Sequence, residues 1–474
     1  MGGLSKRAYQ IDKLRETGRP LLLVDGGGLL FKAATVAPDL APQEKMAAQG
    51  LAEAYRLMRY DAVGITAQDL AAGLPFLQEL AKQHKVPWLS ADLTDRATGK
   101  PLFPASLTRK TGNLTIGIFA LAGPAAAPAL LPGDQAMVRP WQEVVPALLA
   151  SLRKSADLIL LLSGLPAAEN EALARHYPGI HLIVQAGDEG ATSQPPRQVH
   201  NTLLLQTEKQ GKYMGVLDIR WGASGKWGED RTRLLATKQG ELDRVQWFIR
   251  SHQRKGDPAE IYRNAPGKLA AYQEFVAQEQ SLHREIRRLQ QEIVKGEGHS
   301  DALADHRLLA LTTDLPDHPA VQALVEKTTR DMNRLGQELA RAQLERNRAV
   351  TADPGPLVGW QRCADCHRTE ADFWRQSRHA RAYETLRARE QHFNQGCLPC
   401  HVTGPATTTL PAPLQAVGCE SCHGPGRDHS ADPKQPMIKR PPAQTCLGCH
   451  TPDQDDSFDY ARDLLRLNCP GVRP

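Results

Sequence analysis

The first 362 residues of this 474-residue chain contain no cysteine, and no part of the chain has a long apolar run. Crossing a bilayer takes about 20 consecutive apolar residues, so we expect no transmembrane segment. The first twenty residues are charged and lack the apolar core of a signal peptide. The net charge of +5 is spread along the chain, and no basic run alternates with aromatic residues. We therefore expect no nucleic-acid partner.

The length and composition suit several globular domains. A chain of 474 residues is too long for one ordinary hydrophobic core, and two or three domains are expected. Hydrophobic residues make up 41% and charged residues 23%, so most of the chain can fold.

The cysteines that are present follow one pattern. All nine lie between Cys363 and Cys469, and eight of them occur in four copies of Cys-x-x-Cys-His. The copies are Cys363-Ala-Asp-Cys366-His367, Cys397-Leu-Pro-Cys400-His401, Cys419-Glu-Ser-Cys422-His423 and Cys446-Leu-Gly-Cys449-His450.

This pattern is typical of covalent attachment of c-type heme. Two thiols three positions apart reach the two vinyl groups of one porphyrin, and the adjacent histidine binds the iron as proximal ligand. Zinc sites and structural disulfides also use paired cysteines, but neither explains a histidine after every pair. The sequence therefore predicts four covalently bound c-type hemes.

The segment that carries the motifs has little apolar sequence of its own. It is poor in long apolar runs and rich in Pro, Gly, Arg and Asp. We expect the porphyrins to supply most of its buried surface, so this domain should fold only with heme attached. Closely packed hemes allow electrons to pass between neighbouring rings, which predicts an electron carrier.

Distal ligands are in short supply in this segment. Beyond the four proximal histidines it has only His379, His392 and His429. A second imidazole makes an iron six-coordinate and suited to electron transfer, whereas an open position allows ligand binding. Either one heme is open, or its ligand is Met437, a histidine of another domain, or a group of a partner chain.

Three further stretches stand out: W-x-x-S-x-H-A around His379, C-E-x-C-H-G-P-G-x-x-H ending at His429, and Cys-His-x-Thr-Gly from Cys400 to Gly404. With these stretches, residues 357–455 resemble the tetraheme cytochrome c-554 family. The resemblance implies that His379 and His429 are distal heme ligands and that one heme is five-coordinate. His392 matches no motif of the family and is either a further distal ligand or a surface residue. Cys469 is left over as a free thiol.

The N-terminal region alternates between two kinds of pattern. Strand-like apolar runs occur at 19–35, 117–120, 157–162 and 180–184, and helical patterns lie between them, as at 43–59 and 69–85. This alternation predicts an α/β domain.

Residues 2–220 resemble the 5′-nucleotidase branch of the calcineurin-like metallophosphoesterases. The segments that carry the likeness include LLLVDGGGLLF, YDAVGITAQDL, VPWLSADL, DLILLLSGL and PGIHLIVQAGDEG. The resemblance implies an α/β sandwich, but the two-metal ligands of the family are absent. The family's metal-ligand positions are occupied here by Gly28, Ala67-Gln68, Gly164, Gly187 and Glu189.

Hydrolysis in that family needs carboxylate and imidazole ligands around two metals. His84, His176, His181 and His200 do not fall at ligand positions, so we expect packing or surface histidines and an inactive phosphoesterase fold. The family's first metal motif would precede Gly2, so we also expect the domain to be N-terminally incomplete here. A signal peptide is expected upstream of Met1.

Two amphipathic seams lie between these regions. The first runs from Tyr272 to Ile293 and the second from Val321 to Ala342, with Pro316 and Pro319 just before the second. Their similar lengths predict that the two pair as an antiparallel helical hairpin. We expect a spacer, with dimerisation through the exposed seam as the alternative.

These expectations describe a multidomain chain. Residues 1–235 form a phosphoesterase-like α/β domain, 236–350 a helical hairpin, and 351–474 a small, mostly helical and irregular tetraheme domain. The predicted function is an electron carrier in the periplasm or at the cell surface, with redox proteins as donor and acceptor. Two alternatives remain: an oxidoreductase acting on a small nitrogen or oxygen species at an open heme, and a redox-linked binding module that uses the α/β domain.

Overall fold

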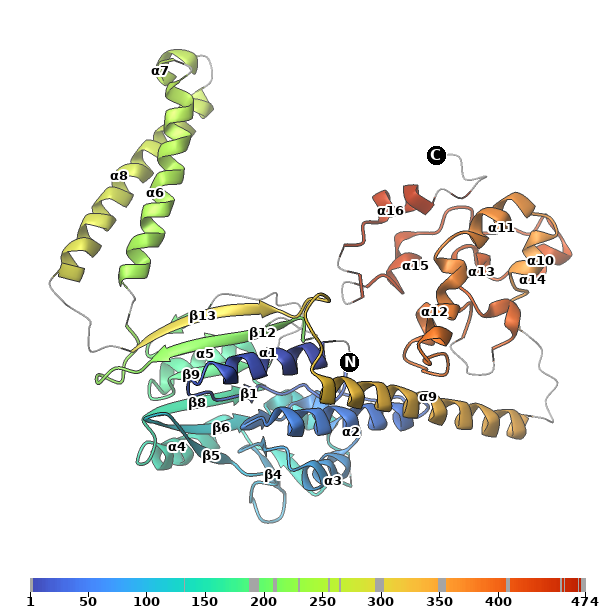
Figure 1. Ribbon diagram of the computed structural model, residues 1–474, viewed down its shortest axis with the longest axis horizontal. Coiled ribbons are helices and arrows are strands. Elements are labelled where there is room, and N and C mark those ends of the chain that lie inside the picture. The colour runs from blue at the N-terminus through green and yellow to red at the C-terminus, as the bar shows by residue number, and fades with distance from the viewer. Residues whose placement is uncertain are drawn as a thin grey trace.

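The computed structural model describes residues 3–131, 133–186, 196–207, 211–228, 231–254, 256–263, 266–294, 302–347, 355–405, 410–451, 454–455, 457–467 and 469. It consists of an α/β body, a helical hairpin that projects from the body, and a C-terminal part built from short helices (Figure 1). Within the described residues, no helix is long and apolar enough to cross a membrane.

The main sheet of the α/β body has six strands in the order β10-β11-β9-β8-β6-β5. The four inner strands are parallel, and the two edge strands are antiparallel to their neighbours. Every residue of the central strand β8 is buried, as expected for a parallel strand covered on both faces. The strands are β5 (Ser106–Thr111), β6 (Leu114–Leu121), β8 (Leu158–Ser163), β9 (Leu182–Gln185), β10 (Arg197–Val199) and β11 (Thr202–Leu205).

A second, parallel sheet packs against the main one. Its strands are β1 (Val24–Asp25), β2 (Ala62–Gly64) and β3 (Trp88–Leu89), and the pair β4 (Leu93–Asp95) and β7 (Ala136–Val138) lies beside it. The helices of the body are α1 (Leu4–Glu16), α2 (Ala41–Met58), η1 (Ala67–Leu70), α3 (Leu74–His84), η2 (Pro124–Ala129), α4 (Trp141–Leu152) and α5 (Ala167–His176). The α/β prediction is confirmed, since the runs at 117–120, 157–162 and 180–184 fall on β6, β8 and β9.

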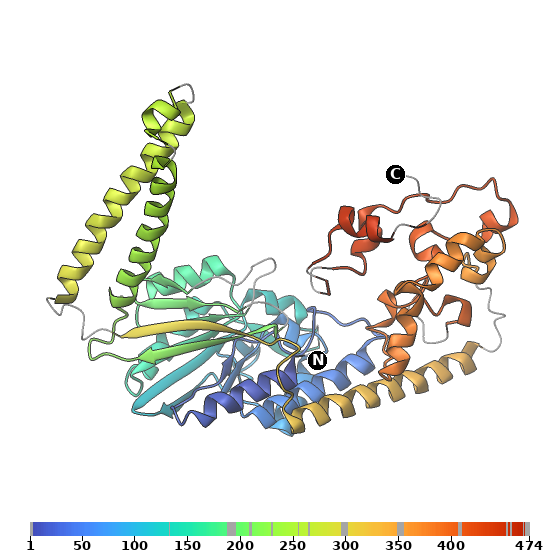
Figure 2. The same cartoon turned by 45° about the horizontal axis from the view of Figure 1, so that its top comes forward.

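A long antiparallel ribbon links the body to the hairpin. Strand β12 (Tyr213–Arg220) pairs with β13 (Leu303–Ala310) along its whole length. Between them in sequence lie α6 (Arg231–Gln253), α7 (Pro258–Ile261) and α8 (Pro266–Val294). Helices α6 and α8 run antiparallel and project away from the body (Figure 2).

The predicted pairing of the two seams is wrong. The first seam lies on α8, which packs on α6 around Val245, Ile249 and Leu282. The second lies on α9 (Pro319–Asn347), which packs on α2 and α1 instead. The reason is β13, which returns the chain to the body before α9 begins and places Val321 in the core of the body. Dimerisation through the hairpin stays a prediction, as do the domain boundaries.

The C-terminal part is helical and irregular, with no strand among its described residues. Its buried apolar cluster is small and consists of Tyr383, Leu386, Leu398, Val402, Leu410 and Leu414. Its helices are α10 (Trp360–Ala364), α11 (Arg368–Arg375), η4 (His379–Arg381), α12 (Ala382–Ala388), η5 (Leu398–Cys400), η6 (Ala412–Leu414), α13 (Cys419–His423), α14 (Arg427–Ala431), α15 (Ala443–Leu447) and α16 (Tyr460–Leu467).

Candidate heme sites

Each Cys-x-x-Cys-His motif lies on a short helical turn. The cysteines of the four motifs lie on or beside α10, η5, α13 and α15. In the first and fourth motifs the histidine N–H donates to the carbonyl of the first cysteine, at 2.9 Å for His367 and 2.8 Å for His450. All nine cysteines lie among the described residues, and none of them forms a disulfide. The thiols are therefore free for thioether bonds.

The proximal histidines are oriented through one ring nitrogen. The Nδ1 atoms of His401 and His423 lie 2.7 and 2.6 Å from the carbonyl oxygens of Ala382 and Ile438. The Nδ1 atom of His450 lies 2.8 Å from a carboxylate oxygen of Asp455. When Nδ1–H donates to such an oxygen, Nε2 keeps its lone pair, and this arrangement is usual for histidines that bind a metal.

The first motif has a second histidine opposite it. The ring centres of His367 and His429 are 6.3 Å apart, with 29° between the ring planes. Metal–nitrogen bonds of about 2 Å on both sides of an iron, with about 1 Å more from each nitrogen to its ring centre, give roughly 6 Å. The Nδ1 atom of His429 lies 2.8 Å from the carbonyl of Gln435, which leaves Nε2 free. The residues present here therefore fit a heme with two imidazole ligands.

The fourth motif has the same arrangement with another partner. His379 lies opposite His450, with 6.1 Å between the ring centres and 75° between the planes. Burial, followed by the neighbouring His450, lowers the pKa of His379, which favours the neutral imidazole that binds metals. The structure thus places each predicted distal residue near a different predicted proximal histidine.

The remaining histidines are arranged differently. His392 packs against Tyr383 and Phe393, with ring centres 6.1 and 4.6 Å away, and its Nδ1 atom is buried without a hydrogen-bond partner. Within the described residues, neither His401 nor His423 has a histidine ring opposite it at the distance seen in the two pairs. Met437 precedes Ile438, whose carbonyl oxygen lies 2.6 Å from the Nδ1 atom of His423.

Motifs that are distant in sequence lie together in space. Helices α10 and α13 pack together, which brings the first and third motifs side by side. The thiol of Cys449 lies 3.9 Å from the carbonyl oxygen of Pro399, which brings the fourth motif beside the second. Each motif therefore has another motif beside it.

Two residues that the sequence reasoning did not single out hold this arrangement together. Glu420 is buried in the third motif, and its carboxylate accepts hydrogen bonds from the backbone N–H groups of Val358, Gly359 and Gly426. Thr403 is also buried and bonds to the backbone of Ala416 and Gly418. Both belong to the motifs that resemble cytochrome c-554, which is the signal that could have marked them.

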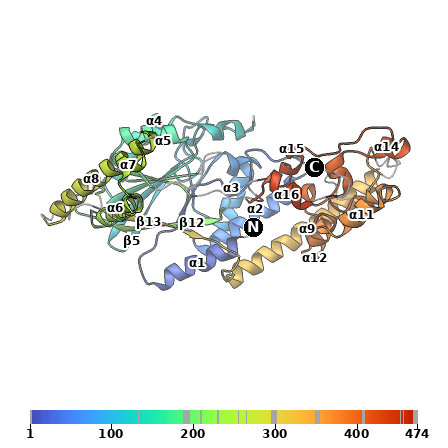
Figure 3. The ribbon, with the colours of Figure 1, turned by 90° about the horizontal axis from the view of Figure 1, so that it is seen from above.

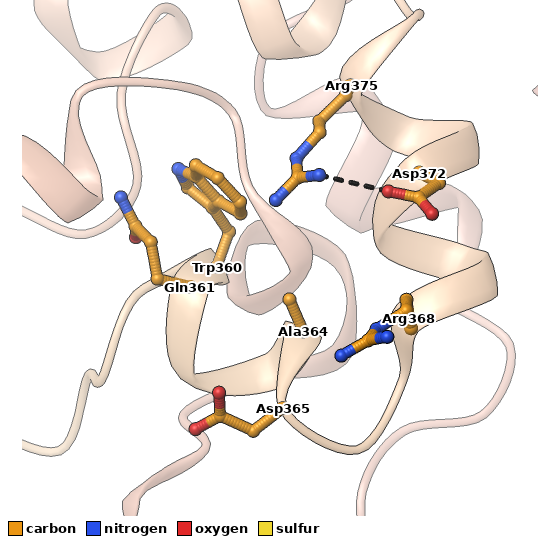
Figure 4. A pocket seen from close by; sticks show the side chains of 7 residues that line it. All are labelled: Trp360, Gln361, Ala364, Asp365, Arg368, Asp372 and Arg375. Atoms are coloured by element: carbon orange, nitrogen blue, oxygen red, sulfur yellow. Dashed lines mark hydrogen bonds and ion pairs between the residues drawn. The ribbon is translucent and has the colours of Figure 1, made fainter.

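A cavity of about 350 Å³ lies beside the first motif, over α10 and α11 (Figure 4). Trp360 and Arg375 form one wall, with the guanidinium 4.7 Å from the ring centre, and Arg375 also pairs with Asp372 at 2.9 Å. Arg368 faces the same cavity. Asp365 also lines the cavity, so two arginines and two aspartates balance its charge next to the first motif.

Gly164, one of the positions expected to match a phosphoesterase metal ligand, lies against closely packed backbone. A Cβ on Gly164 would lie 2.5 Å from the carbonyl oxygen of Ala122, so a histidine does not fit there. The nearby carboxylate of Asp69 is fully buried and accepts bonds from the N–H groups of Gly28 and its two successors. No group of three or more ligand side chains able to hold a metal ion occurs in the part of the chain that the structure describes. Gly187 and Glu189 lie outside that part.

The histidines of the body have local roles. His84 pairs with Glu53 at 3.1 Å, and the Nδ1 atom of His181 accepts the backbone N–H of Ile159 at 2.9 Å. Burial lowers the pKa of His181 to about 4, so this ring stays neutral at physiological pH.

Comparison with known proteins agrees with the C-terminal assignment. Residues 362–424 match the family described as "Cytochrome c554 and c-prime", and residues 412–455 match the "Doubled CXXCH motif" family. Cytochrome c-554 of Nitrosomonas europaea is 34% identical over 110 residues, which cover 19% of this chain and 46% of that protein. The C-terminal segment is thus a multiheme c-type cytochrome. The chain spans less than half the length of this relative.

The solved structures similar to the chain are phosphoesterases and related hydrolases. The sulfate thiohydrolase SoxB of Thermus thermophilus has a TM-score of 0.46 and 16% identity, covering 69% of this chain and 46% of that chain. The calcineurin-like phosphoesterase YfkN of Bacillus subtilis has a TM-score of 0.43 and 14% identity, covering 69% and 88%. A 5′-nucleotidase precursor, also of Thermus thermophilus, has a TM-score of 0.37 and 22% identity, covering 47% and 46%. At these TM-scores the likeness carries no inference about activity.

Proposed function

We propose that this protein carries electrons through four covalently attached c-type hemes. The observation that supports this most directly is the pair of facing histidines at both the first and the fourth motif, 6.3 and 6.1 Å apart. Heme iron held by two imidazoles exchanges one electron without taking up a substrate. Eight cysteines in four motifs provide thioether links for four hemes.

The chain's own residues bind and orient these groups. Each proximal histidine is paired with the two cysteines of its motif, and His429 and His379 are the distal ligands of the first and fourth hemes. The hydrogen bonds from Nδ1 fix the rings of His401, His423 and His450 so that Nε2 is available. The contacts between motifs favour electron transfer along the segment, because neighbouring attachment sites lie close together.

We place the protein in the periplasm or at the cell surface, because heme is attached to such motifs outside the cytoplasm. This location requires export of the chain. The donor and the acceptor are proposed to be redox proteins that meet the C-terminal part.

The test is expression behind a working export signal in a host that matures c-type cytochromes. We expect close to four hemes per chain by pyridine hemochrome assay and peptide masses that place one heme on each motif. EPR spectra should show low-spin signals from the first and fourth hemes. Exported protein without covalent heme would refute the proposal.

A second candidate function is reduction or oxidation of a small nitrogen or oxygen species at an open heme. It is favoured by His401 and His423, which have no facing histidine within the described residues, while the segment has only His392 left to offer. A high-spin EPR signal that disappears when cyanide or nitric oxide is added, together with turnover of such a species, would support it. Four low-spin hemes that bind no added ligand would exclude this second function and leave electron transfer as the proposed function.

A further inference from the structure

A buried glutamine joins the α/β body to the C-terminal part, which carries the heme motifs and which we also call the heme segment. Gln43, in the first turn of α2, is 2% exposed. Its Nε2 donates to the carbonyl of Met332 on α9 at 2.8 Å and to the carbonyl of Phe393 at 2.9 Å. Its Oε1 accepts the N–H of Gln395 at 3.0 Å. One side chain of the body thus holds two backbone groups of residues 393–396, which we call the docking segment.

Helix α9 completes this contact. Asn333 accepts the N–H of Phe393 at 2.9 Å through its side-chain oxygen. Gly336 is buried at the same place, and a Cβ there would lie 2.2 Å from the carbonyl oxygen of Phe393. The helix and the docking segment can approach this closely only because residue 336 is glycine. Helices α2 and α9 lie side by side and extend to the C-terminal part (Figure 3).

The docking segment leads directly into the second heme motif. The carbonyl of Asn394 accepts the N–H of Cys397 at 3.0 Å and that of Leu398 at 3.2 Å. The side chain of Asn394 accepts the N–H of Gly396 at 3.0 Å. The bonds from α2 and α9 thus hold Phe393 and Gln395, the two neighbours of Asn394, and Asn394 in turn holds the backbone at the start of the second motif.

We propose that the α/β body serves as a docking platform that positions the second heme, with Gln43 and Gly336 as positioning residues. This inference rests on the proposed function, because it needs a heme at the second motif. Gln43 is buried, and both atoms of its amide are engaged, mainly by the heme segment. This role would account for a retained α/β fold whose phosphoesterase ligand positions are filled by glycine backbone and by Ala67-Gln68.

The experiment uses the full-length, heme-loaded chain with the variants Gly336→Ala and Gln43→Ala. Alanine at 336 adds only a methyl group and favours the helix more than glycine does, so α9 itself should not unfold. Gly240→Ala is the matched control, because Gly240 also lies within a helix, α6, and nothing lies within 4 Å of the added Cβ. Amide hydrogen exchange and a redox titration are the two measurements.

In Gly336→Ala and Gln43→Ala we expect amide hydrogen exchange across residues 393–401 to become about tenfold faster. Such a change means that the equilibrium constant for local opening of this segment has risen about tenfold. Peptides around the first and fourth motifs should keep their rates. Relative to the parent, one of the four reduction potentials should shift in both variants, and none should shift in Gly240→Ala. A structural role without influence on the heme would move the exchange rates but no potential.

If hydrogen-exchange rates and reduction potentials are both unchanged in both variants, the proposal that the α/β body is a docking platform is refuted. Unchanged potentials alone would overturn the positioning of the second heme. A parent protein that carries no heme on Cys397 and Cys400 would instead refute the proposed function, and the exchange measurement would still report whether the docking contact exists.

Discussion

The imidazole rings of His367 and His429 face each other with 6.3 Å between their centres, although two further heme motifs lie between them in sequence. His379 and His450 form the second such pair, at 6.1 Å. From these two distances we propose His429 as the distal ligand of the first heme and His379 as that of the fourth, and each proposal can be tested by itself.

Removing His429 should open the first heme. In His429→Ala we expect an unchanged heme count and the conversion of one low-spin heme to a high-spin heme, because the iron loses its second imidazole. EPR and visible spectra measure the change. His84→Ala, in the α/β body, is the control and should leave the spectra as they are. A low-spin first heme in His429→Ala would contradict the pairing.

The two pairs should give different low-spin signals. The ring planes are 29° apart in the His367–His429 pair and 75° apart in the His379–His450 pair. Nearly perpendicular imidazoles leave two iron d orbitals close in energy, which gives a broad signal at a large g value, whereas nearly parallel ones give a rhombic signal. We expect His379→Ala to remove the first kind of signal and His429→Ala the second. The opposite assignment would show that the pairs are exchanged.

Asp455 should lower the potential of the fourth heme. The Nδ1 atom of His450 faces its carboxylate at 2.8 Å, whereas His401 and His423 face neutral carbonyls. A carboxylate partner makes the imidazole a stronger electron donor and stabilises oxidised iron. In Asp455→Asn we expect one potential to rise by roughly 60 mV, which is tenfold in a one-electron equilibrium.

A redox titration measures this effect. Asp331→Asn on α9 is a suitable control, because Asp331 pairs with Lys327 and Arg334 and contacts no histidine. Equal potentials in Asp455→Asn and in the parent would mean that the carboxylate does not act on the heme.

The C-terminal part should depend on heme for its folding. Its buried apolar cluster has only six residues, far fewer than the clusters of the α/β body. In chain produced without heme maturation, we expect protease to remove the C-terminal part while the body up to α9 persists, because too little apolar surface is buried to offset the loss of chain entropy. Limited proteolysis followed by mass spectrometry identifies which part of the chain is removed. Equal protection with and without heme would be the contrary result.

Local chemistry is what could be predicted from the sequence. The four heme motifs are complete within five residues each, and the alternating apolar runs were enough for the α/β class. The family motifs marked His379 and His429 as distal ligands, but the sequence did not assign either to a motif. Glu420 and Thr403 lie in the motifs that resemble cytochrome c-554, but their bonds to the backbone of Gly359 and Ala416 could not be predicted, because those partners are distant in sequence.

Tertiary structure decided which elements meet. The seam on α9 could pair with any apolar face of the right length, and the return of the chain through β13 decided that it packs on α1 and α2 and not on α8. Gln43, Asn333 and Gly336 join the body to the heme segment, yet each is an ordinary helix residue in sequence.

The sequence by itself determined where hemes attach, because two thiols and a histidine act within one turn. Only the fold decided which histidines lie near each other and which backbone groups the α/β body holds, because those contacts join residues that are distant along the chain.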